Sequence, residues 1–261
     1  MLFLAVGAYE EFEHFLMESG TAPELGRCDS CVIRDCGICN ALTREELDQF
    51  RQIANRRIYR PGAFIMSSDD ETEFFAAVYS GVVKLAKILA DGRQQVVSLL
   101  LPPDCLGRAY DKKGQNNFYI AEAATEVELC CFPRAGFEQM LEHFSGMKQR
   151  LLEQIMDDLD LARDWMVLLG RKTAEERMAS LLLMLATRST PFRDVAMPAS
   201  PPVEFELHLK RDEIADFLGL SYETVCRQIT ALKKKGIVEL DGTRRFTVPD
   251  LDALAKVAAI N

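Results

Sequence analysis

The sequence lacks the features of a membrane-bound or exported protein. No apolar run approaches the ~20 residues that a membrane-spanning helix needs. Residues 1–8 are apolar, but Glu10, Glu11 and Glu13 follow, and there is neither a basic flank nor a small-residue cleavage site. We therefore expect a cytoplasmic protein without a membrane partner.

Residue patterns used by enzymes are also scarce. The three histidines, His14, His143 and His208, are scattered along the chain and indicate neither a metal site nor a catalytic triad. No glycine-rich loop of the kind that cradles phosphate is present, and no paired carboxylates indicate an acid–base site. We expect no enzymatic activity.

Positive charge is in deficit overall but is unevenly distributed. The chain has 31 Lys and Arg against 40 Asp and Glu, a formal net charge of −9 that by itself argues against nucleic acid. Residues 170–261, however, hold 14 basic residues against 13 acidic ones, and between Arg227 and Arg245 there are six against two. This basic segment indicates a local contact with nucleic acid.

Cysteine, in contrast, is concentrated in two places. Four cysteines lie within the sequence RCDSCVIRDCGIC, at Cys28, Cys31, Cys36 and Cys39, and a Cys130-Cys131 pair follows later. Polar residues between the first four indicate a loop. In a cytoplasmic chain, closely spaced thiols bind metal more often than they form disulfides. We therefore expect an inorganic centre.

The chain divides into four zones that together predict an α+β fold. Residues 1–40 form a cysteine-rich loop region with a short helix expected over 9–17. Residues 41–142 alternate between apolar and polar residues, with turns such as Asp91-Gly92 between segments, which predicts an antiparallel β-roll. Residues 143–170 have helical spacing, and residues 171–261 form a C-terminal domain.

The helical zone carries a narrow apolar stripe. Steps of three and four residues form an a/d seam of Leu152, Ile155, Leu159, Ala162, Met166 and Leu169. Charged residues cover the other faces. An amphipathic helix commonly packs on its own domain, but a long helix with so narrow a stripe favours an interface between two helices. We predict a homodimer through this seam.

The C-terminal domain has the pattern of a winged helix-turn-helix. An apolar face over 214–218 marks the first helix, Gly219 makes the tight turn, and Ser221 is a good N-cap for a second helix to about Lys235. Asp241-Gly242 then turns a two-stranded wing. A non-binding helical pair is the alternative, but the spacing, the wing and the basic segment together favour DNA binding.

Together these features resemble the CRP/FNR superfamily of bacterial transcription regulators over nearly the whole chain. The helix-turn-helix contains LGLSYETVCR, and the segments VELCCFPRAGFEQML and GRKTAEERMASLLL are similar to the FNR branch. The resemblance implies an oxygen-sensing transcription regulator with a sensor roll. It also implies a dimer that binds palindromic double-stranded DNA with TTGAT-like half-sites, and RNA polymerase as a further partner.

The resemblance also implies roles for residues of the second helix and the wing. Glu223 would accept hydrogen bonds from base amino groups, and Arg227 would bind a guanine. Ser221 and Tyr222 lie at the same end of the helix. Cys226 stands where the family usually has Ser, which puts that base contact in doubt. Phosphate contacts would come from Lys233, Lys234, Lys235, Arg244 and Arg245.

For the cysteines, the resemblance implies an oxygen-labile [4Fe–4S] cluster held by three N-terminal thiols and one from the roll. Relatives with a C-x2-C-x7-C array match Cys28, Cys31 and Cys39, and Cys130 lies three residues before a proline, as in the family. In the version of the family with a shorter cysteine spacing, the third ligand would be Cys36 instead of Cys39. Cys105 and Cys131 are expected to be ordinary buried residues.

One departure and two rival interpretations stay open. The cyclic-nucleotide cradle of CRP-type receptors is missing, since Arg108 follows the glycine and no later arginine is present. A cluster-free regulator of the same superfamily could sense another small molecule in the roll. A zinc-stabilised interaction protein could use the four N-terminal cysteines, although only four residues separate the two pairs, against ~12 in common zinc modules.

Overall fold

The computed structural model describes Cys28, Cys31 and residues 33–67, 74–107, 119–188 and 202–259. The helix expected over 9–17, the segment around Arg108 and most of the proline-rich link before residue 202 lie outside these ranges. No helix within them is long and apolar enough to cross a bilayer.

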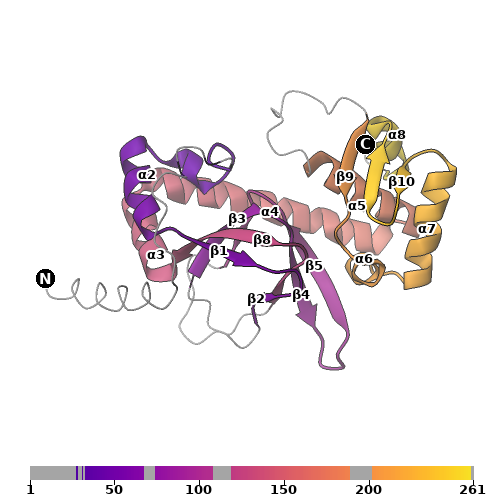
Figure 1. Ribbon diagram of the computed structural model, residues 1–261, viewed down its shortest axis with the longest axis horizontal. Coiled ribbons are helices and arrows are strands. Elements are labelled where there is room, and N and C mark those ends of the chain that lie inside the picture. The colour runs from indigo at the N-terminus through magenta and orange to yellow at the C-terminus, as the bar shows by residue number, and fades with distance from the viewer. Residues whose placement is uncertain are drawn as a thin grey trace, which may run out of the picture.

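The N-terminal half forms an antiparallel roll of two four-stranded sheets, ordered β1-β8-β3-β6 and β2-β7-β4-β5 (Figure 1). Side chains that alternate along the strands meet between the sheets, where Val78, Val83 and Leu129 are fully buried. The strands are β1 (Asn55–Tyr59), β2 (Phe64–Met66), β3 (Phe74–Ser80), β4 (Val83–Ile88), β5 (Gln94–Leu100), β6 (Cys105–Leu106), β7 (Ile120–Ala123) and β8 (Val127–Pro133).

Short helices before and after the roll pack together at one end of it. They are η1 (Ile38–Ala41), α2 (Arg44–Phe50), η2 (Arg51–Ile53) and α3 (Arg134–His143). A capping box between Thr43 and Glu46 begins α2. Phe50 stacks on Phe132 of β8 with ring centroids 4.2 Å apart, which fixes this helical unit on the sheet β1-β8-β3-β6.

A single helix, α4 (Ser145–Arg171), runs from the helical unit to the C-terminal domain (Figure 1). Its first turns bury Met147 and Leu151 against the helical unit, and Leu168 near its other end lies in the core of the C-terminal domain. The middle of the helix lies between these two anchors.

The C-terminal domain is a winged helix-turn-helix, so the predicted α+β fold of roll, long helix and winged domain is confirmed. Its strands pair in the order β10-β11-β9. The strand β9 was not expected. The elements are α5 (Ala174–Arg188), β9 (Val203–Glu206), α6 (Arg211–Leu218), α7 (Tyr222–Lys234), β10 (Glu239–Asp241), β11 (Arg245–Val248) and α8 (Leu251–Val257).

The roll and the C-terminal domain share part of one core. Val96, Leu99 and Leu101, from β5 and the residue after it, belong to the same buried cluster as the residues of α5, α6 and α7. The β4–β5 hairpin therefore packs against α6 through β5, whereas its turn at Gly92, with φ of +86°, and the flanking residues 87–94 are exposed.

Candidate nucleic-acid interface and cysteine centre

The recognition helix α7 owes its position to local interactions. The Ser221 side chain accepts a hydrogen bond from the backbone N–H of Thr224 at 3.2 Å, which caps the helix. Val225, Ile229 and Leu232 are buried in the domain core. Because these three residues occupy one stripe, the helix presents its opposite face to solvent.

The N-terminal turns of that outer face carry the predicted base-reading residues. Ser221, Tyr222, Glu223 and Arg227 are exposed, and Cys226 is half-buried. Arg227 donates from Nη2 to Thr224 Oγ1 at 3.3 Å, which holds the guanidinium beside the start of the helix. The pKa of Glu223 is lowered by hydrogen bonds from its own backbone N–H and from Ser221, so its carboxylate is an acceptor at neutral pH.

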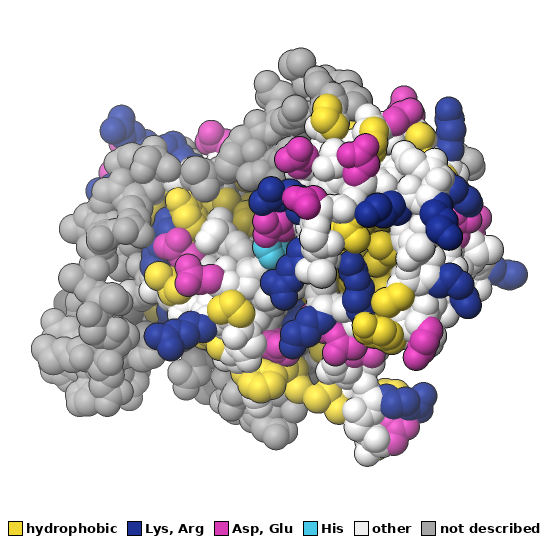
Figure 2. All heavy atoms as spheres, turned by 45° about the vertical axis from the view of Figure 1, so that its right-hand side comes forward, with side chains coloured by type: hydrophobic (Ala, Val, Ile, Leu, Met, Phe, Trp, Pro, Cys, Tyr) yellow, Lys and Arg dark blue, Asp and Glu magenta, His cyan; other side chains and the backbone are white. Residues whose placement is uncertain are grey.

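The basic residues predicted to contact phosphate differ in whether their charge is already paired with a carboxylate. Lys233, Lys234, Lys235, Arg244 and Arg245 are all exposed. Lys235 forms an ion pair with Glu175 at 2.5 Å, and Arg245 lies 3.7 Å from Glu206. Within the described residues, Lys234 and Arg244 form no ion pair. Figure 2 shows Lys and Arg side chains recurring over the right-hand part of the molecule, which includes this domain.

Cys130 and Cys131 lie on opposite faces of β8. Cys131 is buried in the core between the two sheets, whereas Cys130 packs against the helical unit that carries η1. Arg56 of β1 is the cross-strand neighbour of Cys130. Burial raises the pKa of the Cys130 thiol well above its usual value, the charges of Cys39, Cys131 and Cys28 raise it further, and Arg56 lowers it.

The N-terminal thiols surround the same place. Burial raises the pKa of Cys39 to about 12, with further increases from Cys31 and Cys28. Cys28, Cys31, Cys39 and Cys130 are therefore electrostatic neighbours. Cys36 is exposed and donates from Sγ to the carbonyl of Ile33 at 3.5 Å. Partial burial raises the pKa of Cys36, and the charges of Asp35 and Cys31 raise it further, whereas Cys39 and Cys130 do not contribute.

These thiols are grouped but do not form a preformed coordination site. Among the residues that the structure describes, no three Cys, His, Asp or Glu side chains are arranged so that they could hold a metal ion. The donor chemistry nevertheless fits an iron–sulfur cluster, since Cys28 and Cys31 act on Cys39, and Cys28 and Cys39 act on Cys130 of the other segment. Cys105 also lies near this group, because burial raises its pKa and the charge of Cys39 raises it further, and its Sγ donates to Gln154 Oε1 of α4 at 3.5 Å.

Two residues of α4 attach the cysteine segment to that helix. Arg150 donates from Nη2 to the carbonyl oxygen of Cys36 at 2.9 Å. A Cβ added at Gly146 would lie only 2.9 Å from the carbonyl oxygen of Ala41, so the helix and η1 are in close contact there. Sequence reasoning missed both residues, because nothing local distinguishes them from other residues of an amphipathic helix.

The predicted seam on α4 is largely uncovered in the single chain. Leu152, Ile155, Leu159 and Met166 are 60%, 51%, 42% and 73% exposed, and Ala162 is exposed as well. Leu169 differs, because it is half-buried and packs against the core of the C-terminal domain. Such a stripe of large apolar side chains is unusual on a helix in contact only with water.

Comparisons with known proteins agree with this architecture. A family model described as a Crp-like helix-turn-helix domain matches residues 176–257, and one described as a cyclic nucleotide-binding domain matches residues 56–144. The chain is 42% identical to the transcriptional activator protein FnrL of Cereibacter sphaeroides, over 90% of this chain and 92% of that protein.

It is also 35% identical to the nitrogen fixation regulation protein FixK of Bradyrhizobium diazoefficiens, over 82% of this chain and 86% of that protein. The solved structure of FixK2 from Bradyrhizobium japonicum is similar with a TM-score of 0.69 and 29% identity, and the match covers 80% of this chain and 99% of that one.

Proposed function

Because the chain belongs to the CRP/FNR family of transcription regulators, which are not enzymes and which bind DNA as dimers, we propose that it is an oxygen-responsive transcriptional activator. It binds a palindrome of TTGAT-like half-sites while a [4Fe–4S] cluster is intact, and it then engages RNA polymerase in the cytoplasm. The observation that carries this proposal is the grouping of Cys28, Cys31, Cys39 and Cys130 beside the start of α4.

Cys28, Cys31, Cys39 and Cys130 are the residues that would hold the cluster. When bound, the cluster supplies an oxygen-labile cross-link between the N-terminal segment and β8. The chain itself supplies a partly buried setting for Cys39 and Cys130. Since burial keeps both thiols protonated at neutral pH, their ligation releases protons and depends on pH.

The contacts of Arg150 and Gly146 link this centre to the dimer. The cysteine segment rests on the first turns of α4, and the exposed seam begins within the following turns at Leu152. A segment held in place supports the orientation in which two copies of the seam pack together. When the segment is released, that support is lost and the dimer weakens.

In the dimer, the two recognition helices lie one DNA turn apart, ~34 Å. Arg227 binds a guanine through two of its guanidinium nitrogens, and Glu223 accepts from a cytosine or adenine amino group. Lys234 and Arg244, which have no acidic partner within the described residues, are the strongest candidates for phosphate contacts.

An anaerobic absorption spectrum of the purified protein tests the cluster. We expect a broad visible shoulder that bleaches in air, together with loss of binding to the palindrome. A colourless protein that binds the palindrome equally with and without air would contradict oxygen sensing by a cluster.

A second candidate is a cluster-free regulator of the same family. Two observations favour it: no group of three candidate ligands in the described residues is arranged to hold a metal, and the chain is similar to a FixK regulator as well as to FnrL. The zinc-stabilised interaction protein has less support, because zinc held by Cys28, Cys31, Cys36 and Cys39 would leave Cys130 without a role. The same spectrum, with metal analysis, separates the three.

A further inference from the structure

Lys84 of β4 is the one charged residue that is buried among those the structure describes, with 5% of its surface exposed. Its ammonium group forms ion pairs with two carboxylates from different parts of the molecule. Glu122 of the neighbouring strand β7 is 3.0 Å away, and Glu213 belongs to the first turn of α6 in the helix-turn-helix. Lys84 therefore connects the roll to the DNA-binding domain.

The β4–β5 hairpin also holds the other end of α6. Gln94 donates from Nε2 to the Asp216 carboxylate at 2.7 Å. Gln95 donates from Nε2 to the backbone carbonyls of Asp216, at 2.5 Å, and of Phe217, at 3.2 Å. Carbonyl groups in the last turn of a helix have no partner within the helix, so these bonds satisfy groups that would otherwise need water.

The last turn of α6 also contacts α4 and α5. Phe217 packs on Trp165 of α4 with ring centroids 4.5 Å apart. Arg177 of α5 donates to the carbonyls of Leu218, at 3.0 Å, and Leu169, at 2.7 Å. The helix α6 is thus in contact with both the roll hairpin and the end of the long helix.

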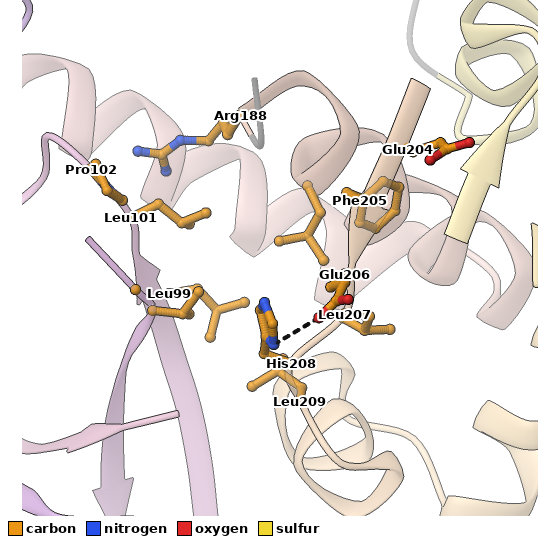
Figure 3. A pocket seen from close by; sticks show the side chains of 13 residues that line it. Leu99, Leu101, Pro102, Arg188, Glu204, Phe205, Glu206, Leu207, His208 and Leu209 are labelled. Atoms are coloured by element: carbon orange, nitrogen blue, oxygen red, sulfur yellow. Dashed lines mark ion pairs between the residues drawn. The ribbon is translucent and has the colours of Figure 1, made fainter. Parts of the chain in front are cut away.

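Elsewhere the two domains are separated by a cavity of about 360 Å³. Figure 3 shows it between Leu99, Leu101 and Pro102 on the roll side and residues 204–209 on the domain side. Arg188 crosses beside it to form an ion pair with Asp104. Because this cavity interrupts the apolar contact that Val96, Leu99 and Leu101 make with the domain, polar contacts help to fix the geometry of the interface, and those of Lys84 are the most buried.

A buried ion pair adds little net stability relative to apolar residues of the same size, but it favours one arrangement over its alternatives. Burial acts to lower the pKa of Lys84, but the hydrogen bonds that it donates to Glu213 and Glu122 outweigh this effect, so the pKa is raised and the group stays charged. The pair is therefore suited to specifying an orientation.

We propose that Lys84, through Glu213, is a positioning residue for DNA recognition, with Gln95 as a second contact. The backbone N–H of Leu220 bonds to the carbonyl of Ala215, and α6 and α7 share one core, so an orientation imposed on α6 is passed to α7. Lys84 thereby sets the angle and separation of the two recognition helices in the dimer. This inference rests on DNA binding by the family and not on the iron–sulfur cluster.

The test measures affinity as a function of half-site spacing. The full-length protein, in whichever redox condition gives wild-type binding, is titrated with palindromes whose half-sites are separated in single-base steps, and with random DNA. Wild-type protein should prefer one spacing sharply. Lys84→Met should lose about tenfold at that spacing, equivalent to ~1.4 kcal/mol, and much less at the others, which flattens the preference.

The matched control is Lys87→Met on the same strand, whose side chain is exposed and forms no ion pair within the described residues. It should keep the wild-type profile. Glu213→Gln retains an acceptor for the Lys210 backbone N–H, so α6 stays capped while the ion pair is weakened.

An unchanged spacing profile in Lys84→Met would overturn the proposal. So would an equal loss at every spacing and on random DNA, because that result describes a residue needed only for folding. If Lys84→Met does not fold, Gln95→Met, which leaves the ion pair intact, should show a smaller flattening of the same profile. A wild-type profile in that variant would also count against the proposal.

Discussion

The recognition helix and the cysteine segment are both polar stretches that carry chemistry, yet they are held in different ways. The helix α7 is capped by its own Ser221 and anchored by its own apolar stripe. The cysteine segment depends on distant residues, namely Arg150 and Gly146 of α4 and Cys130 of β8. A site held by local interactions keeps one conformation when the rest of the protein changes. A site held by remote contacts, in contrast, alters the positions of the elements that it contacts when its own conformation changes.

The seam of α4 connects the two regions, and breaking it should have the largest effect. Ile155→Glu would place like charges against each other across a two-fold interface. We expect a folded monomer whose affinity for the palindrome falls by at least ~100-fold, since the second half-site contact is lost. Sedimentation measures the oligomeric state, and DNA titration measures the affinity.

The control for this change is Asp164→Lys, which also alters charge on α4. Asp164 lies midway between Ala162 and Met166 in the sequence, so its side chain is on the outer face of the heptad, away from the seam. It should stay dimeric. An unchanged dimer in Ile155→Glu would mean that the seam serves another purpose.

The next effect separates two basic residues within α7. Arg227→Ala should weaken binding to the palindrome by ~1–3 kcal/mol while affecting random DNA much less, because it removes a base contact. Lys234→Ala should weaken both about equally and reduce the salt dependence by roughly one unit of slope per subunit. Salt titrations on both duplexes distinguish them, and equal losses for Arg227→Ala would show that it contacts phosphate only.

A third prediction uses two glycines of the same helix. Gly170→Ala should raise the free energy of unfolding by roughly 0.5–1 kcal/mol, because nothing lies within 4 Å of the added Cβ. Gly146→Ala should lower it, because its Cβ meets the carbonyl oxygen of Ala41 at 2.9 Å. Urea unfolding measures both, and a stabilised Gly146→Ala would show that the cysteine segment is not tightly packed against α4.

Part of the fold could be predicted from the sequence alone. The helix-turn-helix, its cap and the Gly219 turn were predictable because each depends on neighbours along the chain. The strand β9 was missed behind a proline-rich link, although Val203, Phe205 and Leu207 are buried in alternation with Glu204 and Glu206. That period-two pattern could have revealed it.

Other features could not be predicted because they join residues far apart. The contact of Lys84 with Glu213 spans 129 positions, and nothing around either residue indicates the other. Alternation along β8 does separate Cys130 from Cys131, which needs no knowledge of distant partners. The choice between Cys36 and Cys39 depends on how the loop folds, which local spacing leaves open.

The smallest predicted effect concerns thiol reactivity in protein without metal. Only thiolates react with iodoacetamide, so a raised pKa delays labelling to higher pH. Cys36, which is exposed, should be labelled before Cys39. The pKa of Cys39 is about 12, so its labelling rate should rise about tenfold per pH unit between pH 8 and 10 and stay below that of Cys36. Mass spectrometry of peptides measures both rates, and faster labelling of Cys39 would show that it is not buried.

The most direct test of the account compares Cys39→Ser with Cys36→Ser, purified without oxygen. Iron and sulfide content is measured together with binding to the palindrome, with Cys105→Ser as a control for loss of a buried thiol. We predict that Cys39→Ser loses iron and specific DNA binding, whereas Cys36→Ser and Cys105→Ser keep both. A full cluster in Cys39→Ser together with loss of iron in Cys36→Ser would contradict the proposed centre.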